Sequence, residues 1–285
     1  MFFLFPCYNV SIKSVEVEGM IMSLHLYVMF FAVSFTASVI GAICGIGGGV
    51  LMKPLLDAFN VLSVALISFL SGCTVLSMSF YSVMRAKRSQ GSQIDRKTGT
   101  PLAVGAAVGG VVGKLLFQYL SNLCADQERV GAVQAACLLT ITLGTMLYTI
   151  RKDKIKTCHV TTPVICSAIG LVLGICSSFL GIGGGPINLV VLYFFFSMET
   201  KMAAQNSLYI ILFSQAASLL NTLATGSVPE SHIGLLVLMV SGGISGGMVG
   251  RKINEKISAG VVDRLFIGLM VLILLVCIYN IYQFF

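Results

Sequence analysis

The chain has 285 residues, of which 56% are hydrophobic and only 10% are charged. A soluble domain carries roughly 25% charged residues, so the composition excludes a soluble globular protein and indicates an integral membrane protein. The net charge of +7 does not indicate nucleic-acid binding, because the basic residues lie mainly in short loops between apolar segments, where they set membrane orientation.

Uncharged stretches recur along the chain, and most have the length of a membrane-spanning helix, since about 20 residues cross a bilayer. They are 26–52, 58–84, 98–113, 130–150, 160–198, 202–229, 233–250 and 265–285. The third reaches span length only beyond Lys114, whose ammonium can extend toward the membrane surface. The fifth is too long for one helix. We therefore expect an all-α membrane protein with about eight transmembrane helices and two extra short helices, at about 49–59 and 186–197.

Two glycine runs interrupt these apolar stretches, at Gly45-Ile46-Gly47-Gly48-Gly49 and at Gly181-Ile182-Gly183-Gly184-Gly185. Glycine is unfavourable inside a helix, so each run predicts a helix break. Broken backbone at membrane depth persists only where it is buried in protein or lines a watery cavity. Each break also exposes a helix N-terminus, which suits an anion, and Pro186 favours a helix start after the second run.

The glycine motifs predict an internal repeat. The two runs lie 136 positions apart, and a second set matches at an offset of 133, namely Gly109, Gly110 and Gly113 with Gly242, Gly243 and Gly246. We expect two four-span units, 24–150 and 162–285, preceded by an N-terminal segment, 1–23, and joined by a basic linker, 151–161. Because four is an even number, both units would enter the membrane from the same side as parallel repeats.

The distribution of Lys and Arg predicts the orientation. With four spans per unit, the loop at 85–97 and the linker lie on one side and outweigh the other side, so both termini are expected in the cytoplasm. The basic loop at 251–264 argues the other way. The predicted location is the cell membrane, meaning the inner or plasma membrane, with multiple spans.

Eleven residues are candidates for contact with a substrate. The glycines of the breaks would offer backbone N–H groups, and polar side chains follow the breaks or open the sixth span. Asn206 and Ser207 either ligate an oxyanion or form hydrogen bonds between helices. Lys53 either pairs with the charge of the substrate or extends to the membrane surface. The full set is Gly47, Gly48, Gly49, Gly183, Gly184, Gly185, Asn206, Ser207, Thr74, Lys53 and Asn188.

The third and seventh spans carry glycines at every fourth position, which places them on one helix face and favours close helix packing. These ladders are Gly105, Gly109, Gly113 and Gly242, Gly246, Gly250. Gly243-Ile244-Ser245-Gly246 also matches the GxSG pattern of intramembrane serine proteases. A serine nucleophile needs a base within hydrogen-bond reach, and the three histidines lie near span ends. We therefore expect no enzyme.

The nine cysteines are scattered and form no CxxC pair, so neither a disulfide framework nor a metal site is expected. No Walker A sequence is present, which argues against direct coupling to ATP, and no cofactor is expected.

The repeated GxGGG breaks, together with Thr200-Lys201-Met202-Ala203-Ala204 opening the sixth span, resemble the TauE/SafE sulfite-exporter family over roughly residues 24–283. The resemblance implies transport of sulfite, sulfonates or related sulfur compounds and small organic anions. It also implies that Gly47–Gly49, Gly183–Gly185, Asn206 and Ser207 line the site. Asn206 stands where the family often has glycine, and Lys53 replaces a usual apolar residue.

The sequence thus predicts a secondary transporter of a small anion, with the lipid bilayer and the anion as its partners. The resemblance makes a sulfur-containing anion the expected class of substrate. No nucleic-acid partner is expected, and a homo-oligomer is left open. The alternatives are a channel-like anion pore that uses the same glycines and, third, the intramembrane serine protease.

Overall fold

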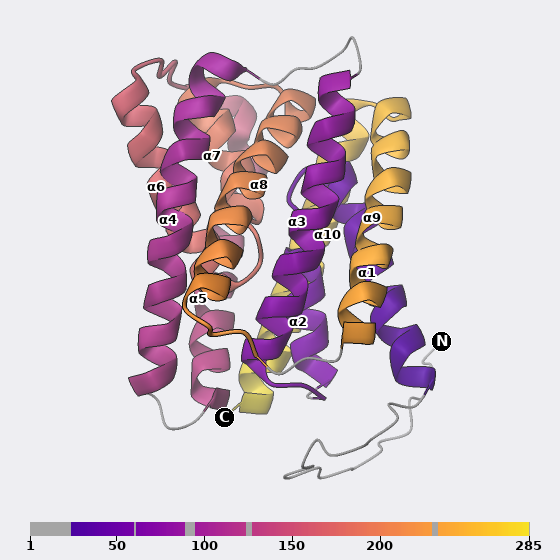
Figure 1. Ribbon diagram of the computed structural model, residues 1–285. Helices are drawn as coiled ribbons and strands as arrows, with labels where there is room; N and C mark the ends of the chain where they lie inside the picture. The colour runs from indigo at the N-terminus through magenta and orange to yellow at the C-terminus, as the bar shows by residue number, and fades with distance from the viewer. Residues whose placement is uncertain (1–23, 60, 89–94, 124–126, 230–232, 285) are drawn as a thin grey trace.

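The protein is described by a computed structural model that covers residues 24–59, 61–88, 95–123, 127–229 and 233–284 (Figure 1). The expected N-terminal segment, 1–23, lies outside these residues. The described part of the chain is helical, with no strand, and eight of its helices are long and apolar enough to cross a membrane. The elements are α1 (Leu24–Cys44), α2 (Gly49–Phe59), α3 (Val64–Arg88), α4 (Arg96–Leu123), α5 (Gln127–Arg151), η1 (Lys152–Lys154), α6 (Pro163–Leu180), α7 (Pro186–Phe196), α8 (Thr200–Ala224), α9 (Ile233–Lys256) and α10 (Ala259–Phe284).

The two predicted helix breaks are confirmed, and positive φ angles explain them. Gly45 and Gly47 have φ of 75° and 73°, and Gly183, Gly184 and Gly185 have φ of 80°, 130° and 70°. Residues with a Cβ rarely adopt this backbone region, so glycine is required where the chain turns out of α1 and α6. The short helices α2 and α7 then begin at Gly49 and at Pro186, as expected.

Close backbone contacts fix the directions of the long helices. A Cβ built on Gly246 would lie 2.4 Å from the carbonyl oxygen of Phe35, and one on Gly250 would lie 2.3 Å from that of Val39. Residue numbers rise together, so α9 runs parallel to α1. In the same way α6 runs parallel to α4, because Gly105 meets the carbonyl of Ser167 and Gly113 that of Ile175. Figure 1 shows α3 rising to one end of the bundle and α4 returning from it.

The expected parallel arrangement of the two units is wrong. We call the end of the bundle where α3 ends and α4 begins the upper end, and the opposite end the lower end (Figure 1). The helix α1 rises from the lower end, whereas α6, which also precedes a glycine break, descends from the upper end. The reason is that α2 takes the chain back to the lower end, where α1 began, and α7 takes it back to the upper end, where α6 began. Each half therefore has five helices that run alternately up and down. Because five is an odd number, the second half starts at the opposite end from the first and is inverted.

The glycine ladders also correspond differently from the expected offset of 133. Gly109 of α4 packs on the carbonyl of Leu171 in α6, and Gly246 of α9 packs on the carbonyl of Phe35 in α1. Phe35 and Leu171 are 136 positions apart, like the glycine runs. Gly109 thus corresponds to Gly246, one helical turn beyond the match expected from sequence. The repeat itself stays a prediction, and inverted symmetry is the form that agrees with these contacts.

We predict that the ladder glycines are required for packing. An alanine at position 109 would place its Cβ 2.1 Å from the carbonyl oxygen of Leu171, so Gly109→Ala should lower the free energy of unfolding by about 1–3 kcal/mol. Gly144 of α5 is a matched control, since a Cβ built there would have no atom within 4 Å. Thermal unfolding in detergent should show a lower midpoint for Gly109→Ala only. Equal midpoints for the two variants would contradict this packing.

Candidate functional site

The two glycine loops, 45–48 and 181–185, meet in the middle of the bundle. A Cβ on Gly49 would lie 2.5 Å from the carbonyl oxygen of Ile182, and one on Gly47 would lie 3.9 Å from that of Gly183. Val75 lies near the middle of α3, and its side chain contacts both loops. We call this meeting point the glycine crossing. It is buried, and larger side chains would not fit between its two backbone segments.

The short helices α2 and α7 leave the glycine crossing in opposite directions, α2 toward the lower end and α7 toward the upper end (Figure 1). Both N-termini therefore face the centre. The first N–H groups of a helix have no partner within it, and its N-terminus carries roughly half a positive elementary charge. Two such ends at one point make a site without ionised groups that is still electropositive, which suits a small anion.

Polar side chains surround the crossing. Asn188, in the first turn of α7, is 1% exposed, and its Nδ2 atom lies next to Gly184. Its Oδ1 atom has no hydrogen-bond partner in the structure. The Nε2 atom of Gln215 lies 3.6 Å from a Cβ built on Gly183. The structure thus brings together the six predicted glycines, Asn188 and Gln215, the last a polar residue of the sixth span that the sequence offers as a candidate of lower weight.

Thr74 and Ser207 are buried but differ in their contacts. The hydroxyl of Thr74 donates to the carbonyl of Leu70 at 2.8 Å, and its methyl group packs on Gly243 of α9. Thr74 therefore packs against α9 at Gly243, while its neighbour Val75 contacts the glycine crossing. The hydroxyl of Ser207 is fully buried and has no hydrogen-bond partner in the structure.

Asn206 lies away from the crossing, between α8 and α4. Its Nδ2 donates to the carbonyl of Met202 at 2.9 Å, and its Oδ1 accepts from the backbone N–H of Asp95 at 3.2 Å. It also lies against Gly99 of α4. These are contacts between helices near the upper end, so the structure places Asn206 with the packing role and apart from the glycines.

Lys53 does not extend to the membrane surface; it lines a small buried cavity with Asp57 and Gln134, and its Cε lies 3.3 Å from a Cβ built on Gly181. It is 3% exposed, and its ammonium donates to Asp57 and to Gln134, both at 2.9 Å. Gln134 in turn donates to the carbonyl of Phe179 at 2.6 Å. The network ties α2 to α5 and to the last turn of α6. Its role in the structure is to hold the short helix whose N-terminus faces the crossing.

A second network holds α7 at the upper end. Lys152 donates to Asp263 at 2.6 Å and to the hydroxyl of Tyr193 at 3.2 Å. Tyr193 also contacts the hydroxyl of Thr200. Burial alone would lower the pKa of Lys152, but the hydrogen bonds to Asp263 and Tyr193 outweigh it and raise that pKa. Lys152 therefore stays charged at neutral pH and links α7 to α10.

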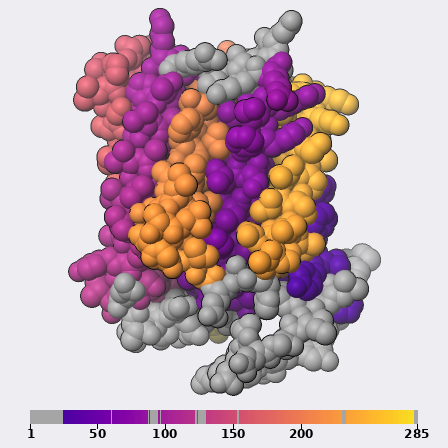
Figure 2. Space-filling view, in the orientation of Figure 1, coloured from indigo at the N-terminus to yellow at the C-terminus, as the bar shows by residue number. Residues whose placement is uncertain are grey.

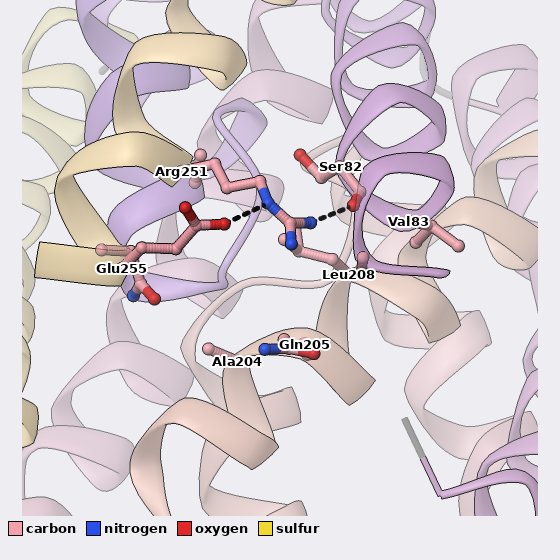
Figure 3. A pocket seen from close by; sticks show the side chains of 10 residues that line it. Ser82, Val83, Ala204, Gln205, Leu208, Arg251 and Glu255 are labelled. Atoms are coloured by element: carbon pink, nitrogen blue, oxygen red, sulfur yellow. Dashed lines mark hydrogen bonds and ion pairs between the residues drawn. The ribbon is translucent and has the colours of Figure 1, made fainter. Parts of the chain in front are cut away.

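Two cavities, each with both polar and apolar side chains in its lining, lie on opposite sides of the crossing. The upper cavity lies between the end of α3, the start of α8 and the end of α9 (Figure 3). The lower cavity lies between the start of α3, α4 and the end of α8, and it reaches Gly181 and Gln215. Each contains a basic side chain, Arg251 above and Lys114 below. The sequence offered one signal for them, because each follows the last glycine of a ladder, Gly250 or Gly113.

We predict that the Lys53–Asp57 pair matters for stability once one partner is removed. Asp57→Asn leaves a buried ammonium without its counter-charge, which typically costs about 3–5 kcal/mol. The double variant Lys53→Met with Asp57→Leu should cost much less, because it buries no charge. Thermal unfolding of both single variants and the double variant checks this. Additive losses in the double variant would show that the two side chains do not act as a pair.

Comparison with known proteins identifies the family of this arrangement. The family model described as Sulfite exporter TauE/SafE matches residues 30–277. The chain is 23% identical over 269 residues to the probable membrane transporter protein YunE of Bacillus subtilis (strain 168), covering 88% of this chain and 96% of that protein. No solved structure matches the chain.

The family match spans most of the chain and includes both glycine loops, both short helices and the greater part of all eight long apolar helices. The chain therefore belongs to the sulfite exporter TauE/SafE family of membrane transporters.

Proposed function

We propose that this protein is a secondary transporter of a small anion, with sulfite, a sulfonate or another sulfur-containing or organic anion as substrate. The observation that carries the proposal is the meeting of two helix N-termini at the buried glycine crossing. Half-helices whose N-termini face a central site are the arrangement by which transporters hold anionic groups. The family's name supports the substrate class.

Recognition at the crossing would depend on neutral donors. The N–H groups of the two helix ends and the side-chain amides of Asn188 and Gln215 carry no net charge. A buried cation would bind an anion more tightly but would itself be costly to desolvate. Neutral donors give weaker and reversible binding, which suits rapid turnover. Lys53 is already neutralised by Asp57, which keeps its full charge away from the site.

A channel-like pore is the second candidate, and the packing at the crossing disfavours it. Val75 of α3 and Ile211 of α8 both contact the glycine loops, and Ile211 comes within 3.3 Å of a Cβ built on Gly47. These contacts lie between the upper and lower cavities. An anion would need a rearrangement to pass, as in a transporter that opens to one side at a time.

An intramembrane protease is disfavoured by the contacts of Ser245. Its hydroxyl donates to the carbonyl of Ser241 at 2.7 Å and lies 3.1 Å from that of Gly242, both within α9. In the described residues, no histidine is hydrogen-bonded to Ser245. A nucleophile needs a base within such reach.

We also infer that the upper end faces the cytoplasm of a cell whose surface membrane holds the protein. The helix α2 returns the chain to the lower end and α7 returns it to the upper end. The basic loops after α3, α5, α7 and α9 therefore all lie at the upper end. Lys and Arg gather on the cytoplasmic side. Basic residues at or near this end include Arg85, Arg88, Lys97, Arg151, Lys152, Lys154, Lys156, Lys201, Arg251, Lys252, Lys256 and Arg264. This orientation puts the start of α1 and the end of α10 outside, in place of the cytoplasmic side expected for the termini.

We predict saturable flux of sulfur-containing anions in proteoliposomes, tested with sulfite, sulfate, thiosulfate and sulfonates. Counterflow, in which unlabelled sulfite on one side drives labelled sulfite across, would support a transporter, and its absence with fast linear flux would favour a channel. If no anion is carried, the proposed function is wrong.

Within the same assay, Gly184→Leu should abolish flux. Its Cβ would lie 2.5 Å from Asn188 Nδ2 and 2.7 Å from Ile211, in a backbone conformation of φ 130°. Gly226→Ala is the control, because Gly226 also has positive φ but no neighbour within 4 Å of its Cβ position. Normal flux in Gly184→Leu would remove the crossing from the substrate path.

The orientation can be tested separately with fusions in a bacterial host. Alkaline phosphatase, which is active only outside the cytoplasm, should be active when fused after residue 285. It should be inactive when inserted after residue 156, in the loop that follows α5. The opposite pair of results would restore cytoplasmic termini.

A further inference from the structure

The upper and lower cavities are built from corresponding positions of the two halves of the chain. In the upper cavity α3 contributes Ser82, Val83 and Ala86; in the lower cavity α8 contributes Ser218, Leu219 and Thr222, each 136 positions later. Ala204, Gln205 and Leu208 of α8 correspond in the same way to Ser68, Phe69 and Gly72 of α3. The same pair of helices thus forms one cavity at each of its ends.

Each cavity also has a basic side chain at one corresponding position. Lys114 follows Gly113 in α4, and Arg251 follows Gly250 in α9, at an offset of 137. Both residues line the cavities, so both side chains turn into the bundle. The two charges therefore lie on opposite sides of the glycine crossing, one in each cavity.

Lys114 has no counter-charge in the described part of the chain. Its neighbour is the ring of Phe117, whose centroid lies 5.2 Å from Nζ. A cation–π contact of this kind is attractive but does not neutralise the charge. Hydroxyl and amide groups of Ser178, Ser218 and Gln134 also line this cavity, together with the apolar side chains of Phe69 and Leu219. An ionisable side chain in a membrane helix usually marks a substrate or ion path.

Arg251 is held more firmly. Its Nη1 donates to the carbonyl of Ser82 at 2.6 Å, and its Nε donates to Glu255 at 2.9 Å (Figure 3). The side chain of Glu255 is 58% exposed, whereas that of Arg251 is 15% exposed. Glu255 is thus an exposed partner that an incoming anion can replace. The remaining guanidinium donors suit the oxygen atoms of an oxyanion.

We propose that Lys114 and Arg251 each form an outer anion-binding site, one in each cavity, through which a small oxyanion passes on its way to or from the glycine crossing. The proposal rests on the proposed function and adds two charged sites to it. The positive charges of Lys114 and Arg251 raise the local concentration of the anion in the two cavities. The anion then moves to the crossing, where it meets only neutral donors and no positively charged side chain that would hold it tightly. The Lys114 site binds more tightly, because Glu255 competes at Arg251 and no described carboxylate competes at Lys114.

The sites can be separated by side in right-side-out and inside-out membrane vesicles, with labelled sulfite supplied to the outer face of each. Lys114→Gln should raise the apparent KM on the side of the lower cavity about 10-fold or more, since a hydrogen bond to a charged ligand is worth about 1.5–3 kcal/mol. It should leave the KM on the other side near wild type. Arg251→Gln should show the reverse, and Lys114→Arg should restore most of the affinity.

Lys252→Gln is the matched control, because Lys252 is an exposed neighbour of Arg251 in the same helix. If Lys114→Gln and Arg251→Gln changed KM no more than Lys252→Gln, or changed it equally on both sides, the proposal would be wrong. Side-specific changes support it.

A second measurement does not depend on transport. Sulfite should raise the thermal midpoint of the purified protein in detergent by binding the folded state, and Lys114→Gln should reduce this shift while Lys252→Gln should not. If wild type carries no sulfite yet shows the Lys114-dependent shift, the outer site stands and the transport proposal fails. If wild type carries sulfite but the shift is the same in Lys114→Gln, transport stands and the outer site fails.

Discussion

The close approach of the two glycine loops is the constraint on which the rest of the structure depends. Backbone atoms at Gly49 and Ile182 lie so near that a Cβ on Gly49 would be 2.5 Å from the Ile182 carbonyl oxygen. Such contact requires glycine at position 49. The positive φ angles at Gly183–Gly185 favour glycine in the second loop for a separate, conformational reason. Because both loops turn in the middle of the bundle, both short helices begin there. The electropositive centre is a consequence of that geometry.

Charges are arranged around this centre in a graded way. Within the membrane-spanning part of the described structure, Lys53 is paired with Asp57 and buried, so it stabilises α2 and adds little charge to the crossing. Lys114 and Arg251 lie further out, in the cavities. The end of α3, with its basic residues, reaches the upper surface (Figure 2). On the proposed path, an anion from that side would meet full charges first and neutral donors last, which would favour capture without trapping.

The glycine ladders connect packing to this arrangement. Gly109 and Gly246 let α4 approach α6, and α9 approach α1, at backbone contact distance. Each pair joins one half of the chain to the other, so neither half forms the bundle alone. The residue after each ladder, Lys114 or Arg251, is placed in a cavity by the same close packing. Substitution of a ladder glycine would therefore affect both stability and the position of a charge.

The sequence by itself determined the membrane class, the eight long helices, both glycine breaks, the starts of α2 and α7, and the family, because hydropathy and glycine conformation are local properties. Only the tertiary structure decided that α2 and α7 each return the chain to the end of the bundle where the preceding long helix began. The directions of these two short helices depend on packing around the crossing. They invert the second half relative to the first and place the basic loops at one end. Packing also placed Asn206 between α8 and α4, gave Lys53 its partner in Asp57, and put Lys114 in a cavity. Contacts between residues far apart in the chain leave no local pattern from which to predict them.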